Sequence, residues 1–412
     1  MIRWTCVLLA CALATGASAQ TTASRPRREP PQTMMLTLSF AGAGAGDSEG
    51  MAPEVAALSG VHADSDAMLT YQRQVRRATL GVSGRTVVRY DARAGAVTPM
   101  RYQGTVGFSM GGTQRQLRAS QTIGYSPFFQ FGAVPQPAPS ALEETALAHG
   151  DFANAGLAAY TSTTDITMNQ AISRRSSLSL SYNLHRTTFG RSDLDQTSLV
   201  GAVSLSHRLT RYISLRTGYG LRSASYPNSA TEAVRVHALD LGLDYSRALS
   251  ISRRTTLNFS SGSVATKLDQ GMAFVMTGDA TLTRMIGRTW NARLALKRDV
   301  HLLEGFAQPV LANSLSTSLG GALNRRTSVA SSIGMSSGTV GVVSATGKNN
   351  YWNWTAGAGL RVTLTRRSAL EAQYFYYGHR FDQDVQLAPG LANQQKRQGV
   401  RVGVTWQTPV LH

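Results

Sequence analysis

Cysteine is almost absent from the chain. Of its 412 residues only two are cysteine, Cys6 and Cys11, and both lie in the first 19 residues. That segment reads as an export signal, with a short apolar stretch and a small-residue cleavage site at Ala17-Ser18-Ala19. Cleavage before Gln20 leaves a mature chain without cysteine. This excludes a disulfide scaffold, a cysteine nucleophile and a cysteine-ligated metal.

Long apolar runs and charged residues are also scarce. After the signal, no apolar run approaches the roughly 18 residues that a membrane helix needs. Charged residues make up 16% of the chain, whereas roughly a quarter is usual for a soluble protein. The mean hydropathy of −0.14 excludes a helical membrane protein, but it agrees with a membrane sheet, in which only every second residue meets lipid.

Acidic residues are few compared with basic ones. The chain has 23 Asp and Glu against 41 Lys and Arg, a formal net charge of +18. Such an excess usually indicates nucleic-acid binding. Here the arginines recur at turns and at alternate strand positions instead of forming one patch. The sequence therefore predicts no nucleic-acid partner.

A short basic segment recurs along the sequence. It starts with two basic residues, or with one in the degenerate copies Arg211-Tyr212 and Gly287-Arg288, and runs into a stretch of alternating polar and apolar residues. The copies from residue 174 onward begin at positions 174, 211, 253, 287, 325 and 366, and an earlier copy begins at Arg76. Such a nearly constant period indicates one repeated supersecondary unit, here strand, basic turn, strand and variable loop. Hairpins repeated behind an export signal predict a transmembrane β-barrel.

Side chains alternate with a period of two along the expected strands. In the closing strand, Val400 and Val402 alternate with Arg401, as in a sheet that separates two unlike media. Several runs reach 12 or more residues. An average soluble strand has about five or six residues, and a tilted membrane strand needs about 9 to 11. These lengths favour a membrane barrel over a soluble sandwich.

The pattern predicts an all-β fold, an antiparallel transmembrane barrel of about 18 strands with a range of 16 to 18. We divide the chain into a signal peptide (1–19), a flexible periplasmic lead-in (20–33) and the outer-membrane barrel (34–412). The first strand is expected over 34–40 and the last is expected to end near Gln407, because Pro409 cannot donate to a ladder. Long loops are expected at 41–66, 91–100, 127–158, 301–310, 339–350 and 381–396.

Short basic turns alternate with these long loops. In outer-membrane barrels the short turns are periplasmic and the long loops are extracellular. An even strand count then places both termini in the periplasm, after export through the general secretion pathway. Expected partners are outer-membrane lipid and the barrel-assembly machinery.

The whole mature chain resembles the β-barrel porin 2 family of bacterial outer-membrane proteins. The resemblance rests on the repeated Arg-Arg strand starts, on Gln121–Phe131 (QTIGYSPFFQF) and on the closing segment Gly399–Trp406. It implies a Gram-negative cell-envelope setting and a barrel whose last strand carries an aromatic assembly signal. Trp406 fits that role, although six residues follow it.

Motifs for catalysis or cofactor binding are missing. No phosphate loop, dinucleotide fingerprint, HExxH or GxSxG occurs, and the eight histidines are scattered without metal spacing. His237 and Asp240 are three residues apart, which places them on opposite faces of a strand. We therefore expect no enzyme, no cofactor and no metal site.

Charged residues on the polar strand faces are expected to line the pore: Arg85, Arg89, Arg101, Arg118, Arg216, Arg222, Asp240, Asp244, Asp279, Arg293, Lys297, Arg361, Glu371 and Arg401. Bases outnumber acids in this set, and rings of Arg or Lys favour anions. A self-paired interior without selectivity is an equal alternative, because buried charges need compensation. The sequence thus predicts a porin-like pore for small solutes, with anionic solutes favoured where the lumen bases are unpaired.

Two other functions stay open. One is an outer-membrane component of envelope or exopolysaccharide export, which would need a periplasmic export partner. The other is a non-conducting structural or adhesion barrel. The loop 127–158 bears on this choice, because it either folds inward as a constriction or covers the mouth.

Overall fold

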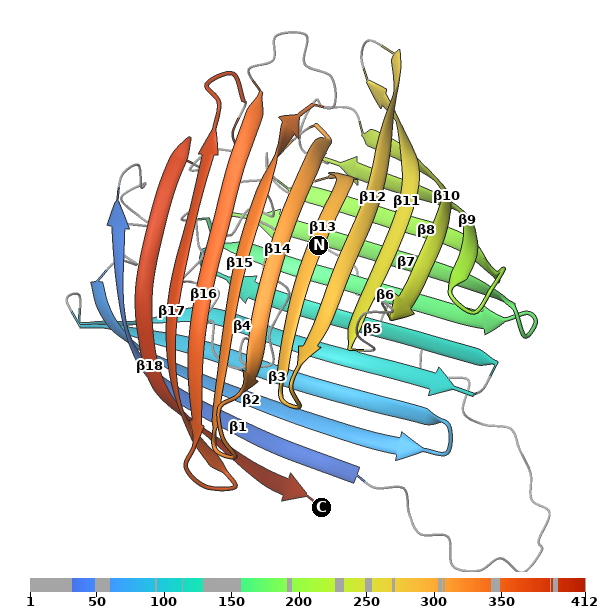
Figure 1. The fold of residues 1–412 in the computed structure, drawn as a ribbon. Coiled ribbons are helices and arrows are strands. Elements are labelled where there is room, and N and C mark those ends of the chain that lie inside the picture. Colours follow the sequence, from blue (N-terminus) through green and yellow to red (C-terminus); the bar gives the residue numbers. More distant parts are fainter. Residues whose placement is uncertain are drawn as a thin grey trace, which may run out of the picture.

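The computed structural model forms one closed antiparallel barrel of 18 strands (Figure 1). Each strand pairs with its neighbours in sequence, and β1 also pairs with β18, which closes the ring. The structure describes residues 32–48, 60–92, 95–112, 114–128, 157–190, 195–226, 233–248, 254–268, 271–302, 306, 308–341, 349–385, 387 and 392–411. Among these residues no helix is long and apolar enough to cross a membrane. The predicted fold class and strand count are confirmed.

The first nine strands are β1 (Gln32–Ser48), β2 (Gly60–Val75), β3 (Ala78–Asp91), β4 (Ala96–Gly111), β5 (Arg115–Ser126), β6 (Ala159–Ala171), β7 (Ser176–Phe189), β8 (Gln196–Arg208) and β9 (Ile213–Ser225). The other nine are β10 (Val234–Ala248), β11 (Thr255–Leu268), β12 (Gly271–Ile286), β13 (Trp290–His301), β14 (Val310–Ala322), β15 (Thr327–Val340), β16 (Asn350–Thr363), β17 (Ser368–Phe381) and β18 (Gln394–Leu411).

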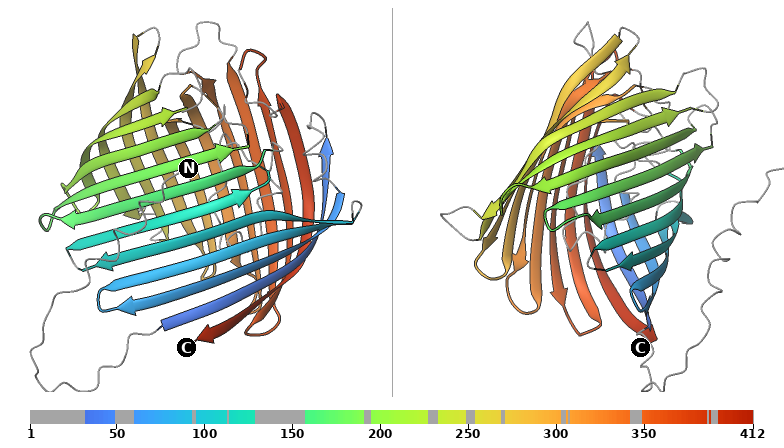
Figure 2. Two further views of the ribbon diagram at one scale, coloured as in Figure 1. Left: turned by 180° about the vertical axis from the view of Figure 1, so that it is seen from behind. Right: turned by 90° about the vertical axis from the view of Figure 1, so that its right-hand side faces the viewer.

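The strands are strongly tilted, as closure of a barrel requires. In Figure 2 the strands of one wall cross those of the opposite wall at a wide angle. Short hairpins lie at one end of the barrel, which we call the turn end, and the longer connections lie at the other, the long-loop end. Met34 pairs with Leu411, so the start of β1 and the end of β18 lie side by side at the turn end.

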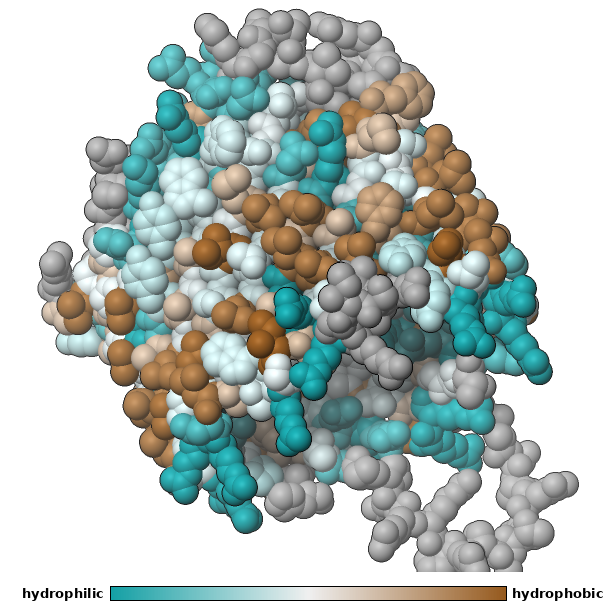
Figure 3. Space-filling model, viewed as in Figure 1, coloured by the Kyte–Doolittle hydropathy of each residue, from teal (hydrophilic) through white to brown (hydrophobic). Residues whose placement is uncertain are grey.

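Successive side chains point alternately out of the barrel and into it. Leu180, Leu241 and Val402 are exposed on the outer face, and 68% of Leu241 is accessible. Their neighbours Asp240 and Arg401 take part in ion pairs on the inner face. Hydrophobic side chains gather across the middle of the outer surface, with hydrophilic ones toward its upper and lower edges (Figure 3). This distribution matches a lipid-facing band between two watery ends.

Four hairpins at the turn end share a capping hydrogen-bond pattern. Ser173 Oγ accepts hydrogen bonds from the backbone N–H groups of Arg175 and Ser176, at 3.1 and 3.0 Å. Thr210, Asn324 and Thr365 accept from the N–H groups two and three residues on in the same way. Such side chains mimic a backbone turn. In these four hairpins the repeated segment is therefore a capped turn, and the capping residue directly precedes the first arginine of the repeat.

Two tryptophans lie over glycines on the neighbouring strand. Trp354 pairs with Gly378 and Trp290 pairs with Gly321. A Cβ at Gly378 would lie 2.7 Å from the Trp354 ring, and one at Gly321 would lie 2.4 Å from the Trp290 ring. Glycine is required at both positions, and the ring covers the backbone that glycine leaves bare.

Some predicted boundaries are wrong. The segment 41–66 was expected to be a loop, but β1 continues to Ser48 and β2 starts at Gly60. Its glycines and alanines were taken for loop residues. In the strand, Ala41, Ala43 and Ala45 face inward, where a small side chain is needed.

The last strand also runs further than expected, to Leu411. Pro409 is tolerated for two reasons. β17 starts at Ser368, opposite Trp406, so no residue of β17 pairs with Pro409. On the other side, the pairing with β1 shifts register next to Pro409. The signal peptide, residues 20–31 of the lead-in and residues 129–156 of the longest loop lie outside the described residues.

Candidate functional site

The lumen wall carries every residue that the sequence analysis expected to line a pore. The strand registers place all fourteen on the inner face of the barrel. The structure does not gather them into one constriction. Most are instead distributed over separate ion pairs on two opposite parts of the wall.

One of these groups, the seam cluster, consists of His62, Asp64, Arg89 and Arg401. Asp64 accepts hydrogen bonds from Nε and Nη2 of Arg89, at 2.7 and 3.0 Å, and another from Nη2 of Arg401. His62 Nε2 lies 3.8 Å from the same carboxylate. All four residues are buried. One carboxylate thus compensates two buried guanidinium groups, as buried charges require.

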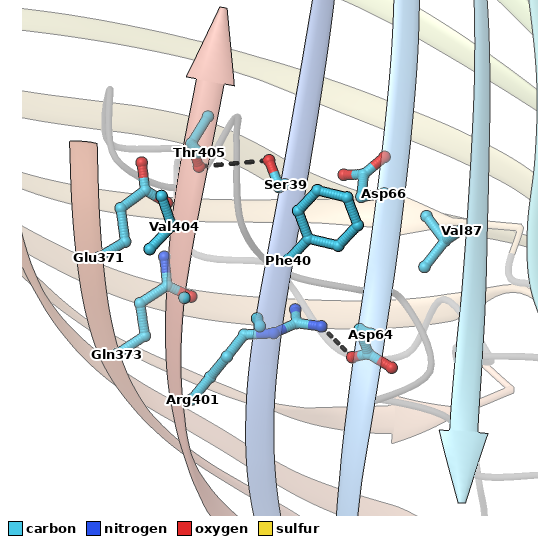
Figure 4. A pocket seen from close by; sticks show the side chains of 12 residues that line it. Ser39, Phe40, Asp64, Asp66, Val87, Glu371, Gln373, Arg401, Val404 and Thr405 are labelled. Atoms are coloured by element: carbon cyan, nitrogen blue, oxygen red, sulfur yellow. Dashed lines mark hydrogen bonds and ion pairs between the residues drawn. The ribbon is translucent and has the colours of Figure 1, made fainter. Parts of the chain in front are cut away.

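The seam cluster spans the strand pairings where the barrel closes. Arg401 on β18 reaches over β1 to Asp64 on β2 (Figure 4). Ala41 lies opposite Asp64, and Ala43 lies opposite Arg401, so the strand in between presents only methyl groups. The cavity beside them, between Ser39 and Thr405, holds about 30 Å³, which is room for about one water molecule. This part of the wall is packed and leaves no room for a solute.

Two further ion pairs flank the seam cluster. Arg85 Nη2 lies 2.5 Å from Asp66, and Arg361 Nη1 lies 3.3 Å from Glu371. Both pairs join neighbouring strands on the same wall. Sequence analysis missed Asp64 and Asp66 because it placed them in a loop.

The opposite wall carries a second group of ion pairs. Arg216 lies 2.6 Å from Asp240 and 3.2 Å from Asp244. Arg222 on β9 reaches Asp299 on β13 at 3.2 Å, although three strands separate them in the sheet. The wall therefore folds into a tight corner at β10–β12. Val236, Val264, Val275 and Val300 form a small buried cluster there, which we call the corner cluster.

Two lumen arginines differ from the others. Arg118 on β5 and Arg293 on β13 are exposed, and neither forms an ion pair with any residue that the structure describes. Rings of unpaired bases attract anions in pores. The charge of these two side chains is therefore not offset by a described acidic partner.

An apolar plug lies at the long-loop end. It comprises nine buried residues: Ala159, Phe189, Phe306, Val310, Ala312, Val340, Tyr351, Phe381 and Val385. The rings of Phe306 and Phe381 lie 5.6 Å apart between centroids, and those of Tyr351 and Phe381 lie 6.2 Å apart. Because β6 and β7 lie across the ring from β14–β17, the plug joins opposite walls.

A hydrogen bond from another wall fixes the plug. The Tyr226 hydroxyl, just after β9, donates to the backbone oxygen of Phe306. Phe306 lies between β13 and β14. Phe306 itself is therefore buried among residues of the inner wall.

Toward the turn end, the plug is followed by pairs of inner side chains that include both aromatic and polar residues. The next inner residues of β17 and β18 are His379 beside Gln395, Tyr377 beside Arg397, and Phe375 beside Gly399. All six residues are buried. A Cβ at Gly399 would lie 2.5 Å from the Phe375 ring, so glycine is required for that ring to pack.

The plug was not predicted, and the sequence shows a trace only of the aromatic layers below it. Residues 374–377 are four consecutive aromatics. In a strand with alternating faces, two of them must point inward. The plug residues themselves come from distant strands and connections, and no local pattern links them.

No metal-binding group occurs in the described part of the chain. Its residues contain no group of three His, Asp or Glu side chains that could hold a metal ion. His237 lies beside Tyr219, with 2.7 Å between Nδ1 and the hydroxyl, on the outer face of the barrel. Asp240 faces the lumen, which confirms that the two residues lie on opposite faces.

Comparison with known proteins supports the fold. No protein-family model and no curated protein matches the chain by sequence, so membership of the β-barrel porin 2 family stays a prediction. OccK2 (OpdF) of Pseudomonas aeruginosa has a similar structure, with a TM-score of 0.51 and 10% identity over 93% of this chain and 100% of that chain. OccK2 in complex with glucuronate gives a TM-score of 0.50, at the same identity and coverage. The fold is that of outer-membrane porin barrels.

We expect Asp64→Asn to destabilise the barrel. The change leaves Arg89 and Arg401 buried without their shared carboxylate, which typically costs about 3–5 kcal/mol. Asp240→Asn is the matched control, because a third of that side chain is exposed (33%) and the loss there should be about 1 kcal/mol or less. Denaturant unfolding in lipid vesicles measures both. Equal losses would contradict a special role for the seam cluster.

Proposed function

We propose that the chain is a porin-like pore of the bacterial outer membrane that passes small solutes. The observation that carries the proposal is the closed 18-stranded barrel with an apolar outer face and a charged inner face. An inner wall of this kind is expected where water and solutes occupy the lumen. The similar barrel OccK2 has been crystallised with glucuronate, a small anionic sugar acid.

Weak anion selectivity follows from the pairing of the lumen charges. The charges of the paired arginines and their acidic partners largely cancel. The number of basic residues therefore overstates the positive electrostatic potential in the lumen. The unpaired, exposed Arg118 and Arg293 supply the remaining positive charge. We therefore expect a modest preference for anions that depends on these two side chains.

Replacing both unpaired arginines tests this selectivity. In planar bilayers with a salt gradient, Arg118→Gln with Arg293→Gln should shift the reversal potential toward cations, because rings of basic residues favour anions. Arg298→Gln is the control, since Arg298 lies on the outer face and donates to the backbone oxygen of Met276. An unchanged reversal potential in the double variant would show that neither arginine lines the conduction path.

The apolar plug is a candidate barrier to solutes, because it links opposite walls across the lumen. Hydrophobic constrictions exclude water and hydrated ions. The plug also favours a second candidate function, a non-conducting structural or adhesion barrel, because a permanent link between opposite walls would close the lumen. It gives no support to polysaccharide export, which needs a wide passage.

Removing the plug rings separates the pore from the structural barrel. Phe306→Ser with Phe381→Ser should increase single-channel conductance, because it removes two aromatic rings from the barrier and lets water enter. Val264→Ser in the corner cluster is the control, since that cluster lies within one part of the wall. If neither the wild-type chain nor the double variant conducts, the structural-barrel function is favoured.

We further propose that the turn end faces the periplasm, with both termini on that side. Support comes from the short capped hairpins at one end and the longer connections at the other, which is the arrangement of outer-membrane barrels. Trp406, exposed on the outer face of β18, would then present its ring near the periplasmic end. This placement suits its proposed role as a signal to the assembly machinery.

An epitope tag checks the orientation. A tag inserted at residues 388–391, between β17 and β18, should bind antibody on intact cells. A tag between Arg174 and Arg175 should bind antibody only after the outer membrane has been permeabilised. The reverse pattern would invert the topology, and a tagged chain that still shifts on heating in a gel serves as the folding control.

A further inference from the structure

Arginines encircle the turn end. Fifteen exposed arginines lie in the short hairpins or on the strand residues next to them: Arg73, Arg76, Arg77, Arg115, Arg174, Arg175, Arg208, Arg211, Arg254, Arg284, Arg288, Arg325, Arg326, Arg366 and Arg367. They belong to hairpins from β2–β3 through to β16–β17. We call this set the basic collar.

Acidic residues are missing from the same region. No Asp or Glu occurs in the short hairpins, or within three residues on either side of them, in the sequence that the structure describes there. The described acids instead face the lumen or lie toward the long-loop end, as Asp91, Asp195 and Asp382 do. The collar therefore has no internal counter-charge, and its surroundings must supply one.

The hairpins of the collar also expose aliphatic side chains. In six of them an exposed aliphatic residue stands two positions before an arginine: Val75 and Arg77, Ile172 and Arg174, Leu209 and Arg211, Ile286 and Arg288, Leu323 and Arg325, Leu364 and Arg366. These aliphatic side chains are 46% to 60% exposed. In a turn surrounded only by water, an exposed aliphatic side chain contributes no hydrophobic stabilisation.

The pairing of an aliphatic residue with an arginine suits a membrane surface. The apolar side chain can enter the acyl boundary while the guanidinium group stays among the headgroups. Trp290 starts β13 and Trp406 lies near the end of β18, so aromatic rings occupy the same end, as at other membrane interfaces. A soluble acidic partner would explain the arginines but would not explain the aliphatic residues.

The distribution around the barrel points to the same partner. The six hairpins span strands β2 to β17, and thus nearly the whole circumference. A single protein partner would contact one side, whereas a leaflet surrounds the barrel. The turn N–H groups already have acceptors in the capping side chains of Ser173, Thr210, Asn324 and Thr365. Most guanidinium groups of the collar can therefore bind a partner outside the barrel.

We propose that the basic collar binds the phosphate groups of anionic phospholipids in the leaflet at the turn end. Juxtamembrane arginines attract anionic lipid through the surface potential and through hydrogen bonds to phosphate oxygens. The arginines retain an annulus of anionic lipid around the barrel. This binding requires only that the barrel lies in a membrane, so it is independent of whether the lumen conducts.

Tryptophan quenching by brominated lipid tests the proposal. The mature chain has four tryptophans, Trp290, Trp352, Trp354 and Trp406. A variant with Trp352→Phe and Trp354→Phe reports on the turn end, and one with Trp290→Phe and Trp406→Phe reports on the long-loop end. Each is refolded into phosphatidylcholine vesicles that contain phosphatidylglycerol, with either lipid brominated. Brominated phosphatidylglycerol should quench the turn-end pair with about twofold or greater relative affinity, a preference that salt should weaken.

Matched charge variants identify the source of this preference. The preference for phosphatidylglycerol at the turn end should be abolished by the triple variant Arg174→Gln, Arg325→Gln and Arg366→Gln. Lysine at the same three positions should retain this preference. The control variant carries Arg118→Gln, Arg293→Gln and Lys297→Gln, which remove the same number of charges from the lumen. Its preference for phosphatidylglycerol should be unchanged.

Several results would overturn the proposal. They are equal quenching of the turn-end pair by both lipids, an equal preference at the long-loop end, or loss of the preference in the lumen variant. Binding of soluble peptidoglycan fragments that depends on the collar, without any lipid preference, would assign this surface to an acidic polymer instead. A heat shift in gels verifies that each variant is folded.

Discussion

Backbone hydrogen bonding is the constraint on which the rest of the structure depends. In hydrocarbon every N–H and C=O group of the wall must find a partner, and a sheet can achieve this only by closing on itself. The pairing of β1 with β18, from Met34 opposite Leu411 to Ser48 opposite Lys396, removes the last open edges. Closure then fixes which side chains meet lipid and which face the lumen, and hence where charges can be tolerated.

Local pattern was sufficient to predict the strands and the two faces. The basic turns and the period of two placed nearly every hairpin, and all fourteen expected lumen residues lie on the inner face. The exceptions arose where composition misleads. The Gly-Ala stretch at 41–46 resembles a loop, and Asp64 and Asp66 resemble loop acids. Only the need for Arg401 to pass over β1 explains why small residues stand there.

Contacts across the lumen could not be predicted in the same way. Which residues meet from opposite walls depends on the diameter, the tilt and the shape of the barrel, and none of these is encoded in a single strand. Phe189 and Phe306 join the same plug although more than a hundred residues separate them. The Arg222–Asp299 pair likewise depends on the corner at β10–β12. A count of charges therefore could not predict how the lumen charges are paired.

The seam cluster has a consequence for the order of folding. All other neighbouring strands are consecutive in sequence and can form as local hairpins, which are fast because little chain entropy is lost in bringing them together. Asp64 and Arg401 are 337 residues apart, and their contact can form only once the two chain ends have met. The cluster thus adds a strong, ionic interaction to the one step with a large entropic cost. A barrel that fails to close keeps two unpaired edges and two uncompensated arginines, a state that is costly in lipid and distinguishable from the finished fold.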